Sequence, residues 1–515
     1  MFYFVNTSMN LKKSGIEHAE MKRLALFNKH GVPAKIVTRF FSLSLHETLA
    51  AAGIAENNQI NLFDFIQNST GFKPRKLTIA DLNLPAEYQV TADAHNYKVE
   101  QDDQLRMRVN TISATDSRLN NVQYFDRNGK LTKTEWYDTR GFKGLEQFYT
   151  FDGQVASEQV FDPQGKVVYQ TFHMQNKQGK VKNSLYRFID YHGCDWSFNG
   201  EEAMMRFFLD ELNQVDNGRN VFVVDRTYEL AWSTLRMHTR PFRVMHLHSN
   251  HVNDPADPRH SALNYNYELA LNNLADWNGV IAATQQQADD FTARYGTTTP
   301  IFTIPVGVVA DELSAQPPVK WSKRTPGKVV MVARLSEEKQ QDQLIKAIKK
   351  VHAKFPQVSL DFWGYANGDT GTKLHQLVTE LGVGDYVKFN DYTTDVGQVY
   401  DHAQLAVLTS RAEGFALALL EGQAHGLPQV AYDIKYGPQA IIRDQQDGLL
   451  VPLNDIDALA EAIYTLLSDP AKLQAYSKQA YQDSQRYSEN AVWYAWQQLI
   501  TAAEQYYSQK GGANK

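Results

Sequence analysis

The alternation of apolar and polar positions predicts parallel α/β structure at the start of the chain. A short apolar strand is expected over residues 2–6, a helix with one apolar side over 16–29, and a second strand over 33–38. Strands that alternate with helices in this way are typical of a parallel, doubly wound sheet.

The pattern changes near residue 88 and stays rich in aromatic and β-branched residues until about residue 190. Four short segments combine an aromatic residue, an Asp that can cap its own turn, and a Gly suited to a positive φ. These segments are 125–130, 137–141, 151–153 and 161–166. Their recurrence predicts an antiparallel β-meander.

The α/β pattern returns at about residue 200 and forms two series, separated by the Pro-rich polar segment 314–326. Strands of the first series are expected at 220–225, 242–246, 279–283 and 301–305. Strands of the second are expected at 329–333, 359–363, 405–409 and 429–432, before a long helix over 488–508. The expected fold class is α/β, with two doubly wound domains, a linker, and an antiparallel β insertion in the first domain.

Composition and charge are those of an ordinary globular protein. A chain of 515 residues allows about three structural units. Its 58 acidic and 52 basic residues give a net charge of −6, which argues against a general nucleic-acid binder. Residues 121–190 carry ten Lys or Arg against eight Asp or Glu, so this stretch is mildly basic. It is either a solvated sheet face or a docking surface for an anionic or extended partner.

The compartment is expected to be the cytoplasm. Cys194 is the single cysteine, so no internal disulfide can form, which suits a reducing environment. Residues 1–6 do not resemble a signal peptide, and no window approaches the roughly 20 apolar residues of a spanning helix. We therefore expect no transmembrane segment, with peripheral contact at the inner face of the membrane left open.

Two cations follow the first strand of the second series. Ser336 is expected to begin a helix there, with Arg334 just before it and Lys339 in its first turn. A cation at a helix N-terminus opposes the macrodipole. The pair would therefore suit an anion such as a phosphate, bound by the same backbone N–H groups. The alternative is two solvated surface cations.

A second candidate anion site follows the third strand of that series. Gly414 permits a tight strand-to-helix turn, and the free N–H groups of residues 415–417 would open the helix. Glu413 and Glu421 are both expected to point toward the cleft at the strand ends. A carboxylate on the largely apolar helix needs donors, which sugar hydroxyls would supply. The alternative is that both acids are merely solvated.

Other chemistries have little support. Residues 364–368 follow a strand but lack the glycine spacing of a dinucleotide fingerprint or P-loop, and no G-x-S-x-G nucleophile elbow occurs. His246 and His248 alternate on one strand and could share a metal, contact a substrate, or be structural. Because no carboxylate ligand adjoins them in sequence, no metal site is predicted.

These residues carry a resemblance to retaining glycosyltransferases of family 4. Glu413-Gly414-Phe415 with Glu421 resembles the E-x7-E signature, and Arg334 with Lys339 matches the family's cationic pair. Ser14-Gly15-Ile16-Glu17 resembles the N-terminal Gly loop. Asp433–Pro438 and the β insertion make the chain similar to wall teichoic acid α-glucosyltransferases. The accessory-secretion glycosyltransferases of Ser-rich adhesins are close relatives.

The resemblance implies a GT-B fold, in which two Rossmann-like domains face a cleft. The implied parts are the N-terminal domain in two pieces (1–87 and 196–313), a β-meander insertion for acceptor binding or oligomerisation (88–195), a linker (314–326), a nucleotide-sugar-binding domain (327–487), and a C-terminal helix crossing back to the first domain (488–515).

The resemblance also implies roles for individual residues. The implied catalytic residues are Glu413, Arg334, Lys339 and His246. The implied donor-binding residues are Gly15, Gly364, Tyr392, Thr393, Gly414, Phe415, Ala416, Leu417 and Glu421. Candidate contacts to the acceptor or sugar are His248, Lys435 and Tyr436; the role of His251 is left open.

The implied activity is transfer of glucose from UDP-glucose to a poly(glycerol-phosphate) or poly(ribitol-phosphate) teichoic acid, with retention and without a metal or other cofactor. The alternatives are an O-GlcNAc transferase of Ser-rich adhesins, which would need a partner subunit, and an idle fold that only binds a polymer. No nucleic-acid partner is expected, and self-association through the β insertion is left open.

Overall fold

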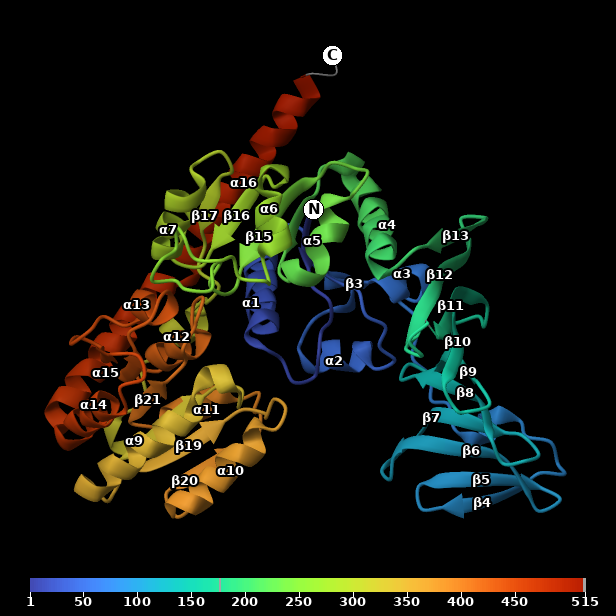
Figure 1. Ribbon diagram of the computed structural model, residues 1–515, viewed down its shortest axis with the longest axis horizontal. Coiled ribbons are helices and arrows are strands. Elements are labelled where there is room, and N and C mark those ends of the chain that lie inside the picture. The colour runs from blue at the N-terminus through green and yellow to red at the C-terminus, as the bar shows by residue number, and fades with distance from the viewer. Residues whose placement is uncertain (176, 513–515) are drawn as a thin grey trace. The chain divides into compact units, whose positions relative to one another are not determined.

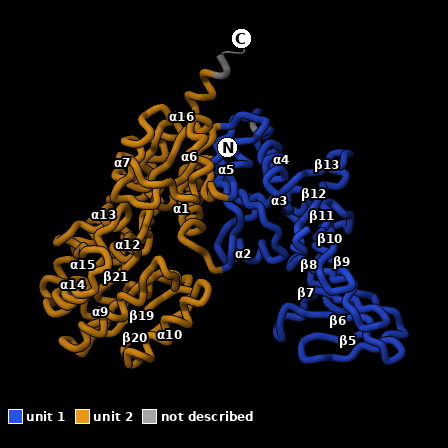
Figure 2. The backbone as a smooth tube through the Cα atoms, viewed as in Figure 1, with its two compact units in different colours: residues 1–11, 33–222, 229–241 blue, residues 12–32, 223–228, 242–515 orange. Residues whose placement is uncertain are grey.

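The computed structural model describes residues 1–175 and 177–512. The chain forms two compact units, each discontinuous in sequence (Figure 2). Unit 1 comprises residues 1–11, 33–222 and 229–241, and unit 2 comprises residues 12–32, 223–228 and 242–515.

Unit 1 begins with parallel α/β structure. Strands β1 (Phe2–Val5), β2 (Ala34–Thr38) and β3 (Gln59–Asn61) pair in that order, as the sequence predicts for the first two. Helix α2 (Leu45–Ala51) lies between β2 and β3 in the chain, and α3 (Leu62–Gln67) follows β3. Strand β1 is buried along its whole length, which explains its uninterrupted apolar sequence.

The predicted meander is present as one antiparallel sheet in which each strand pairs with its sequence neighbours (Figure 1). Its strands are β4 (Gln89–Asp93), β5 (Asn96–Gln101), β6 (Gln104–Ser113), β7 (Asp116–Phe125), β8 (Leu131–Asp138), β9 (Phe142–Tyr149), β10 (Val155–Phe161), β11 (Val167–Gln175), β12 (Val181–Tyr191) and β13 (Cys194–Phe198). Helix α4 (Glu201–Gln214) follows the sheet.

The predicted turns use the expected local chemistry. The glycine of each of the four turns has a positive φ; these are Gly129, Gly141, Gly153 and Gly165. Asp126 shows the capping, because its Oδ1 accepts backbone N–H groups from Asn128 and Lys130 at 2.8 and 2.9 Å. These turns are set by local sequence, which is why they could be predicted.

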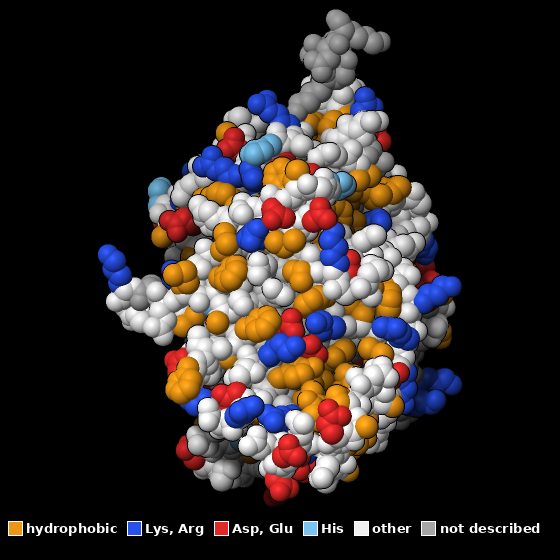
Figure 3. Space-filling model, turned by 90° about the vertical axis from the view of Figure 1, so that its right-hand side faces the viewer, with side chains coloured by type: hydrophobic (Ala, Val, Ile, Leu, Met, Phe, Trp, Pro, Cys, Tyr) orange, Lys and Arg blue, Asp and Glu red, His pale blue; other side chains and the backbone are white. Residues whose placement is uncertain are grey.

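The sheet carries charges of both signs in close pairs. Lys133 lies 2.9 Å from Glu146, and Arg187 lies 2.7 Å from Asp195. Figure 3 shows the side of the molecule that carries this sheet, where Lys and Arg side chains are interspersed with Asp, Glu and hydrophobic ones. The mild basic excess of residues 121–190 therefore does not gather into one broad basic field on this face.

Unit 2 contains the first helix of the chain and most strands of the first series. Helix α1 (Gly15–Lys29) belongs to it, with the parallel strands β15 (Phe242–Leu247), β16 (Gly279–Ala282) and β17 (Ile301–Thr303), which pair in that order. The remaining elements of this region are α6 (Glu268–Asn272), α7 (Gln285–Tyr295) and α8 (Asp311–Ser314). Strand β14 (Val221–Val224) and helix α5 (Thr227–Leu235) each span a boundary between the units.

The second series forms a parallel sheet in the order β20-β19-β18-β21-β22-β23. Its strands are β18 (Lys328–Val332), β19 (Ser359–Trp363), β20 (Val387–Asn390), β21 (Leu405–Leu408), β22 (Gln429–Tyr432) and β23 (Gly448–Val451). Its helices are α9 (Gln341–Lys354), α10 (Thr370–Leu381), α11 (Val396–His402), α12 (Leu417–Ala424), α13 (Gly437–Ile441), α14 (Ile456–Ser468) and α15 (Pro470–Ser484). They surround the sheet (Figure 1).

The last helix, α16 (Glu489–Gly512), packs against α1 within unit 2. The ring of Phe27 lies edge-on to Trp493 and Trp496, with centroids 5.3 and 5.2 Å apart. The Trp and Tyr residues of the predicted terminal helix therefore serve to dock it. Among the described residues, none of the helices combines the length and apolar character of a bilayer crossing.

One predicted helix start was wrong. The sequence suggested that a helix begins at Ser336, but residues Glu337–Lys339 form a 3-10 turn, and α9 begins only at Gln341. Gln340 takes a left-handed conformation with φ 50°, which separates the turn from the helix. Lys339 therefore precedes α9 and does not lie in its first turn.

Candidate functional site

The N-termini of two helices lie close together in unit 2. Gly15 is the first residue of α1 and Leu417 the first of α12. A Cβ atom built on Gly15 would lie 3.9 Å from Leu417 Cδ1. The first-turn N–H groups of a helix have no partner within the helix and favour anions. The structure therefore brings the N-terminal Gly loop next to the candidate anion site at the start of α12, which lies about 400 residues away in sequence.

The start of α1 is held by a capping box. The backbone N–H of Ser14 donates to Glu17 Oε2 at 2.7 Å, and Arg226 donates to Glu17 Oε1 at 2.7 Å. Burial alone would raise the pKa of Glu17, but the Ser14 hydroxyl and the Arg226 guanidinium outweigh it and lower the pKa. Glu17 is therefore an ionised carboxylate that fixes the loop before α1.

The start of α12 depends on close backbone packing. A Cβ atom on Gly414 would lie 2.4 Å from the carbonyl oxygen of His248, so a side chain cannot fit there. Ala416, the N-cap residue, has φ 68°. The backbone N–H of Tyr436 donates to the Glu413 carbonyl oxygen at 2.9 Å. The loop before α12 is thus held between the end of β15 and the segment after β22.

Both predicted cations have carboxylate partners. Lys339 Nζ lies 2.6 Å from Glu413 Oε1, which also accepts a hydrogen bond from Ser410 Oγ at 2.7 Å. Arg334 lies 3.3 Å from Glu338. The Lys339–Glu413 pair is mostly buried, whereas the side chains of Arg334 and Glu338 are each 38% exposed. An incoming diphosphate would compete with Glu413 for the Lys339 ammonium.

Glu421 contacts α1 through an ion pair that the sequence does not predict. Lys22 Nζ donates to Glu421 Oε1 at 2.7 Å. His18 lies one turn before Lys22, and burial lowers the pKa of its imidazole, although Glu421 acts in the opposite direction. The Tyr392 hydroxyl is 3.3 Å from His18 Nε2. Gly15, His18 and Lys22 have the spacing i, i+3, i+7, which places them on one face of α1. This spacing is the sequence signal that could have identified Lys22.

Gly364 and Thr393 were predicted to bind the donor, and their contacts within the protein are structural. A Cβ atom on Gly364 would lie 2.2 Å from the carbonyl oxygen of Ala333, so this glycine allows β19 to pass close to the segment before Arg334. Thr393 Oγ1 accepts the backbone N–H of Asp395 at 3.1 Å. The candidate sugar contacts differ in access, since Lys435 pairs with Asp290 at 2.8 Å and Tyr436 is fully buried.

The histidines at the end of β15 share a buried carboxylate. Asp225 Oδ1 lies 3.0 Å from His246 Nδ1 and 2.7 Å from His248 Nε2. Arg23 of α1 contacts the same carboxylate, with NH1 3.2 Å from Oδ1. No carboxylate adjoins these histidines in sequence, but the fold places Asp225, which follows β14, within hydrogen-bond distance of both.

Burial and charge set the protonation of this group. Burial lowers the pKa of His246 to about 3, and the charge of His248 adds to the shift against the opposing Asp225. Burial alone would raise the pKa of Asp225, but Arg23 and the two histidines hold it well below its usual range. His246 is therefore neutral and Asp225 ionised at neutral pH.

This cluster has the composition of a metal site, since ligand atoms of Asp225, His246 and His248 lie within 4.8 Å of one another. The guanidinium of Arg23, however, is bound to the same carboxylate. A fixed cation at that position repels a divalent ion. The donor set therefore fits a hydrogen-bonded network better than a metal centre.

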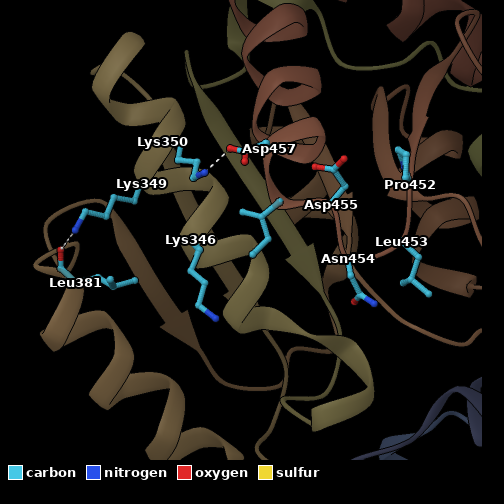
Figure 4. Close-up of a pocket in the computed structure, with 10 residues that line it drawn as sticks. Lys346, Lys349, Lys350, Leu381, Pro452, Leu453, Asn454, Asp455 and Asp457 are labelled. Carbon is cyan, nitrogen blue, oxygen red and sulfur yellow. Dashed lines mark hydrogen bonds and ion pairs between the residues drawn. The ribbon is translucent and has the colours of Figure 1, made fainter.

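A separate cavity of about 970 Å³ lies between α9 and the start of α14 (Figure 4). It is lined by Lys346, Lys349, Lys350, Leu381 and residues 452–457, none of which belongs to the predicted site. Its lysines are occupied: Lys349 donates to the Leu381 carbonyl oxygen at 3.0 Å, and Lys350 pairs with Asp457. No ligand is assigned to this cavity.

The chain is similar in sequence to known glycosyltransferases. Residues 315–483 match the family model described as "Glycosyl transferases group 1". The chain is 26% identical, over 97% of its length and 98% of the relative's, to the UDP-N-acetylglucosamine–peptide N-acetylglucosaminyltransferase GtfA subunit of Streptococcus gordonii. It is 21% identical, over 96% of its length and 98% of the relative's, to the poly(ribitol-phosphate) alpha-N-acetylglucosaminyltransferase of Staphylococcus aureus (strain COL).

Solved structures show the same fold across the whole chain. The pneumococcal O-GlcNAc transferase GtfA in complex with UDP and GlcNAc superposes with a TM-score of 0.84 at 21% identity, covering 98% of both chains. A structure of TarM gives a TM-score of 0.81 at 18% identity, covering 97% of this chain and 98% of that one. A GtfA/B complex gives 0.80 at 22% identity, covering 98% and 99%.

The chain has the GT-B fold of these glycosyltransferases, with an antiparallel β insertion. Its C-terminal domain, residues 315–483, is a group 1 glycosyltransferase domain. The predicted fold class and the family resemblance are confirmed.

Proposed function

We propose that this protein transfers a hexose from a UDP-sugar to a hydroxyl acceptor, with retention of the anomeric configuration and without a metal. The observation that carries the proposal is the ion pair between Lys339, in the turn before α9, and Glu413, in the loop before α12. Gly15, at the N-terminus of α1, faces the same point. Two helix termini and a cation form a site for a diphosphate.

In this proposal, Glu413 and Glu421 contact different parts of the donor. Glu421 would accept hydrogen bonds from the ribose hydroxyls, at the side of the site where Lys22 and Tyr392 lie. Glu413 would lie beside the donor sugar. Lys339, released from Glu413 by the diphosphate, would neutralise the negative charge that develops as UDP departs, together with Arg334. Interactions that strengthen as this charge develops raise the rate of the chemical step.

For the acceptor, we propose a Ser or Thr hydroxyl of a protein and N-acetylglucosamine as the sugar. The full-length similarity to the Streptococcus gordonii transferase supports this choice. The paired charges on the antiparallel sheet also support it, because the face drawn in Figure 3 carries no broad basic field for a polyphosphate chain. The GtfA/B complex supports a requirement for a second subunit.

A teichoic acid acceptor is the second candidate, with either glucose or N-acetylglucosamine as the sugar. It is favoured by the similarity to the Staphylococcus aureus relative and by the TM-score of 0.81 to TarM. The Bacillus subtilis poly(glycerol-phosphate) alpha-glucosyltransferase is 22% identical over 71% of this chain and 54% of the relative, which supports glucose in that case.

The experiment is a matrix of two donors, UDP-glucose and UDP-N-acetylglucosamine, against two acceptors, a Ser-rich peptide and a poly(ribitol-phosphate) polymer. Product formation is followed by mass spectrometry, with EDTA present and with the second subunit added where it is available. The proposal expects transfer of N-acetylglucosamine to the peptide in EDTA, and an α-linkage by proton NMR. Transfer only to the polymer selects the second candidate, and absence of UDP release from both donors refutes both.

A further inference from the structure

Asp225 holds two histidines and an arginine that come from different parts of unit 2. His246 and His248 lie at the end of β15, and Arg23 lies on α1. The side chain of Asp225 is completely buried, and those of His246 and Arg23 are 2% and 5% exposed. A buried carboxylate with this many donors is stable as an ion only while all of them remain in place.

The hydrogen-bond geometry selects one tautomer of His246. Nδ1 lies 3.0 Å from Asp225 Oδ1 and 3.0 Å from NH1 of Arg23. If Nδ1 accepted from Arg23, its lone pair would face the carboxylate oxygen, and a buried Nε2–H would lack an acceptor among the described residues. If Nδ1–H donates to Asp225, Arg23 can donate to the carboxylate at 3.2 Å, and no two lone pairs or two protons are opposed.

The assigned tautomer places a lone pair on His246 Nε2. This atom is buried and has no hydrogen-bond partner in the described protein. Such an atom is costly unless a ligand supplies a donor. Two residues further along, the His248 backbone is in contact with Gly414 in the loop before α12. The end of β15 that carries His246 is therefore part of the site that would bind the donor sugar.

Asp225 and its neighbour also connect this histidine to the phosphate side of the site. Asp225 binds Arg23, while the next residue, Arg226, binds Glu17. Glu17 is the capping residue of the loop at Gly15. Two consecutive residues thus hold one helix at two points, and the ring of Trp496 lies 5.7 Å from the Arg23 guanidinium carbon on another side.

We infer that Asp225 is a positioning residue: it holds His246 with Nδ1 protonated, so that Nε2 accepts a hydrogen bond from a hydroxyl or amide group of the substrate during sugar transfer. The inference rests on the proposed function for the identity of the substrate. Asp225 itself touches no reacting atom and acts through His246 and, by way of Arg23, through the placement of α1.

The first test compares Asp225→Asn with wild type in steady-state UDP release. The expected result is a fall in kcat of about 10- to 100-fold with little change in the donor KM, because the substitution removes the charge that favours the proton on Nδ1. The control is Asp361→Asn, which breaks a partly buried pair with Lys328 at 2.9 Å, within the C-terminal sheet. An unchanged kcat in Asp225→Asn overturns the inference. A fall in kcat together with a raised donor KM and a lowered melting temperature also overturns the inference, because that pattern indicates only a structural role.

The second test observes the wild-type protein directly and does not depend on activity. Nitrogen-15 NMR of labelled histidines, with His246→Gln to assign the signals, reports which ring nitrogen carries the proton. The inference expects protonated Nδ1 and unprotonated Nε2, and a protonated Nε2 overturns it. If wild type releases no UDP from any donor while Nδ1 is protonated, the proposed function fails and the assigned tautomer stands.

Discussion

Lys22 of α1 and Glu421 of α12 form an ion pair, with Nζ and Oε1 2.7 Å apart and both side chains about one-quarter exposed. The pair joins the helix that begins at the Gly loop to the helix that begins after the first Glu of the E-x7-E pattern. Because the two helix N-termini also meet, their relative placement is fixed at two points. A nucleoside bound beside Glu421 must share this carboxylate with Lys22.

The first prediction concerns that carboxylate. Glu421→Gln is expected to raise the donor KM about 10- to 100-fold with a smaller effect on kcat, since it weakens charge-assisted hydrogen bonds to the ribose. Steady-state UDP release at varied donor concentration measures both constants. The control is Glu461→Gln, whose exposed pair with Lys354 at 3.0 Å lies outside the proposed site. An unchanged donor KM in Glu421→Gln would place the ribose elsewhere.

The second prediction concerns the two cations. Arg334→Ala and Lys339→Ala are each expected to lower kcat/KM by a few orders of magnitude, about 3–4 kcal/mol. Each substitution removes a positive charge that would stabilise the departing diphosphate. Lys346→Ala is the matched control, since Lys346 pairs with Asp342 on an exposed part of α9. Near wild-type turnover in either variant would contradict the assignment of that residue to the leaving group.

The third prediction concerns backbone packing at the start of α12. Gly414→Ala is expected to abolish most activity, because its Cβ would lie 2.4 Å from the His248 carbonyl oxygen and would force the loop away from β15. Gly384→Ala is the control, because its Cβ would meet Val378 at an ordinary 3.7 Å. Activity and melting temperature are measured together. Wild-type activity in Gly414→Ala would show that the loop and β15 need not touch.

The fourth prediction concerns stability against pH. Burial and a hydrogen bond with Asp483 raise the pKa of Asp447 to about 7. A carboxyl whose folded-state pKa is raised binds more protons when folded than when unfolded between about pH 4 and pH 7. Its contribution to the free energy of unfolding is therefore present below about pH 4 and is lost as the pH rises to 7.

Asp447→Asn is expected to remove this dependence, so that the variant gains stability relative to wild type between pH 5 and pH 8. Urea unfolding at several pH values measures the effect. Asp457→Asn serves as the control, because Asp457 is exposed and pairs with Lys350 at the surface. The same pH slope in wild type and in Asp447→Asn would refute the raised pKa.

Local features of this molecule could be predicted from its sequence, whereas tertiary partners could not. The turn at Asp126 and Gly129 follows from short-range hydrogen bonds and a positive φ, and the sequence specifies both. Glu413 and Glu421 stood out through their spacing around Gly414. Their spacing did not identify the residues that contact them in the folded protein.

The missed partners come from segments far apart in the chain. Lys22 lies 399 residues before Glu421, and Asp225 lies 202 residues after Arg23. No periodic pattern marks such pairs, because each depends on how distant helices and strands pack. The misplaced start of α9 has a local cause, since the 3-10 turn that ends at Lys339 carries the same N-cap signal as a helix.

The most direct test of the account is a crystal structure of this protein with UDP bound. We expect the diphosphate at the N-terminus of α12, within hydrogen-bond distance of Lys339 and the backbone of residues 415–417, with the ribose hydroxyls on Glu421. UDP bound elsewhere, such as in the cavity between α9 and α14, with Lys339 still bound to Glu413, would contradict the central claim.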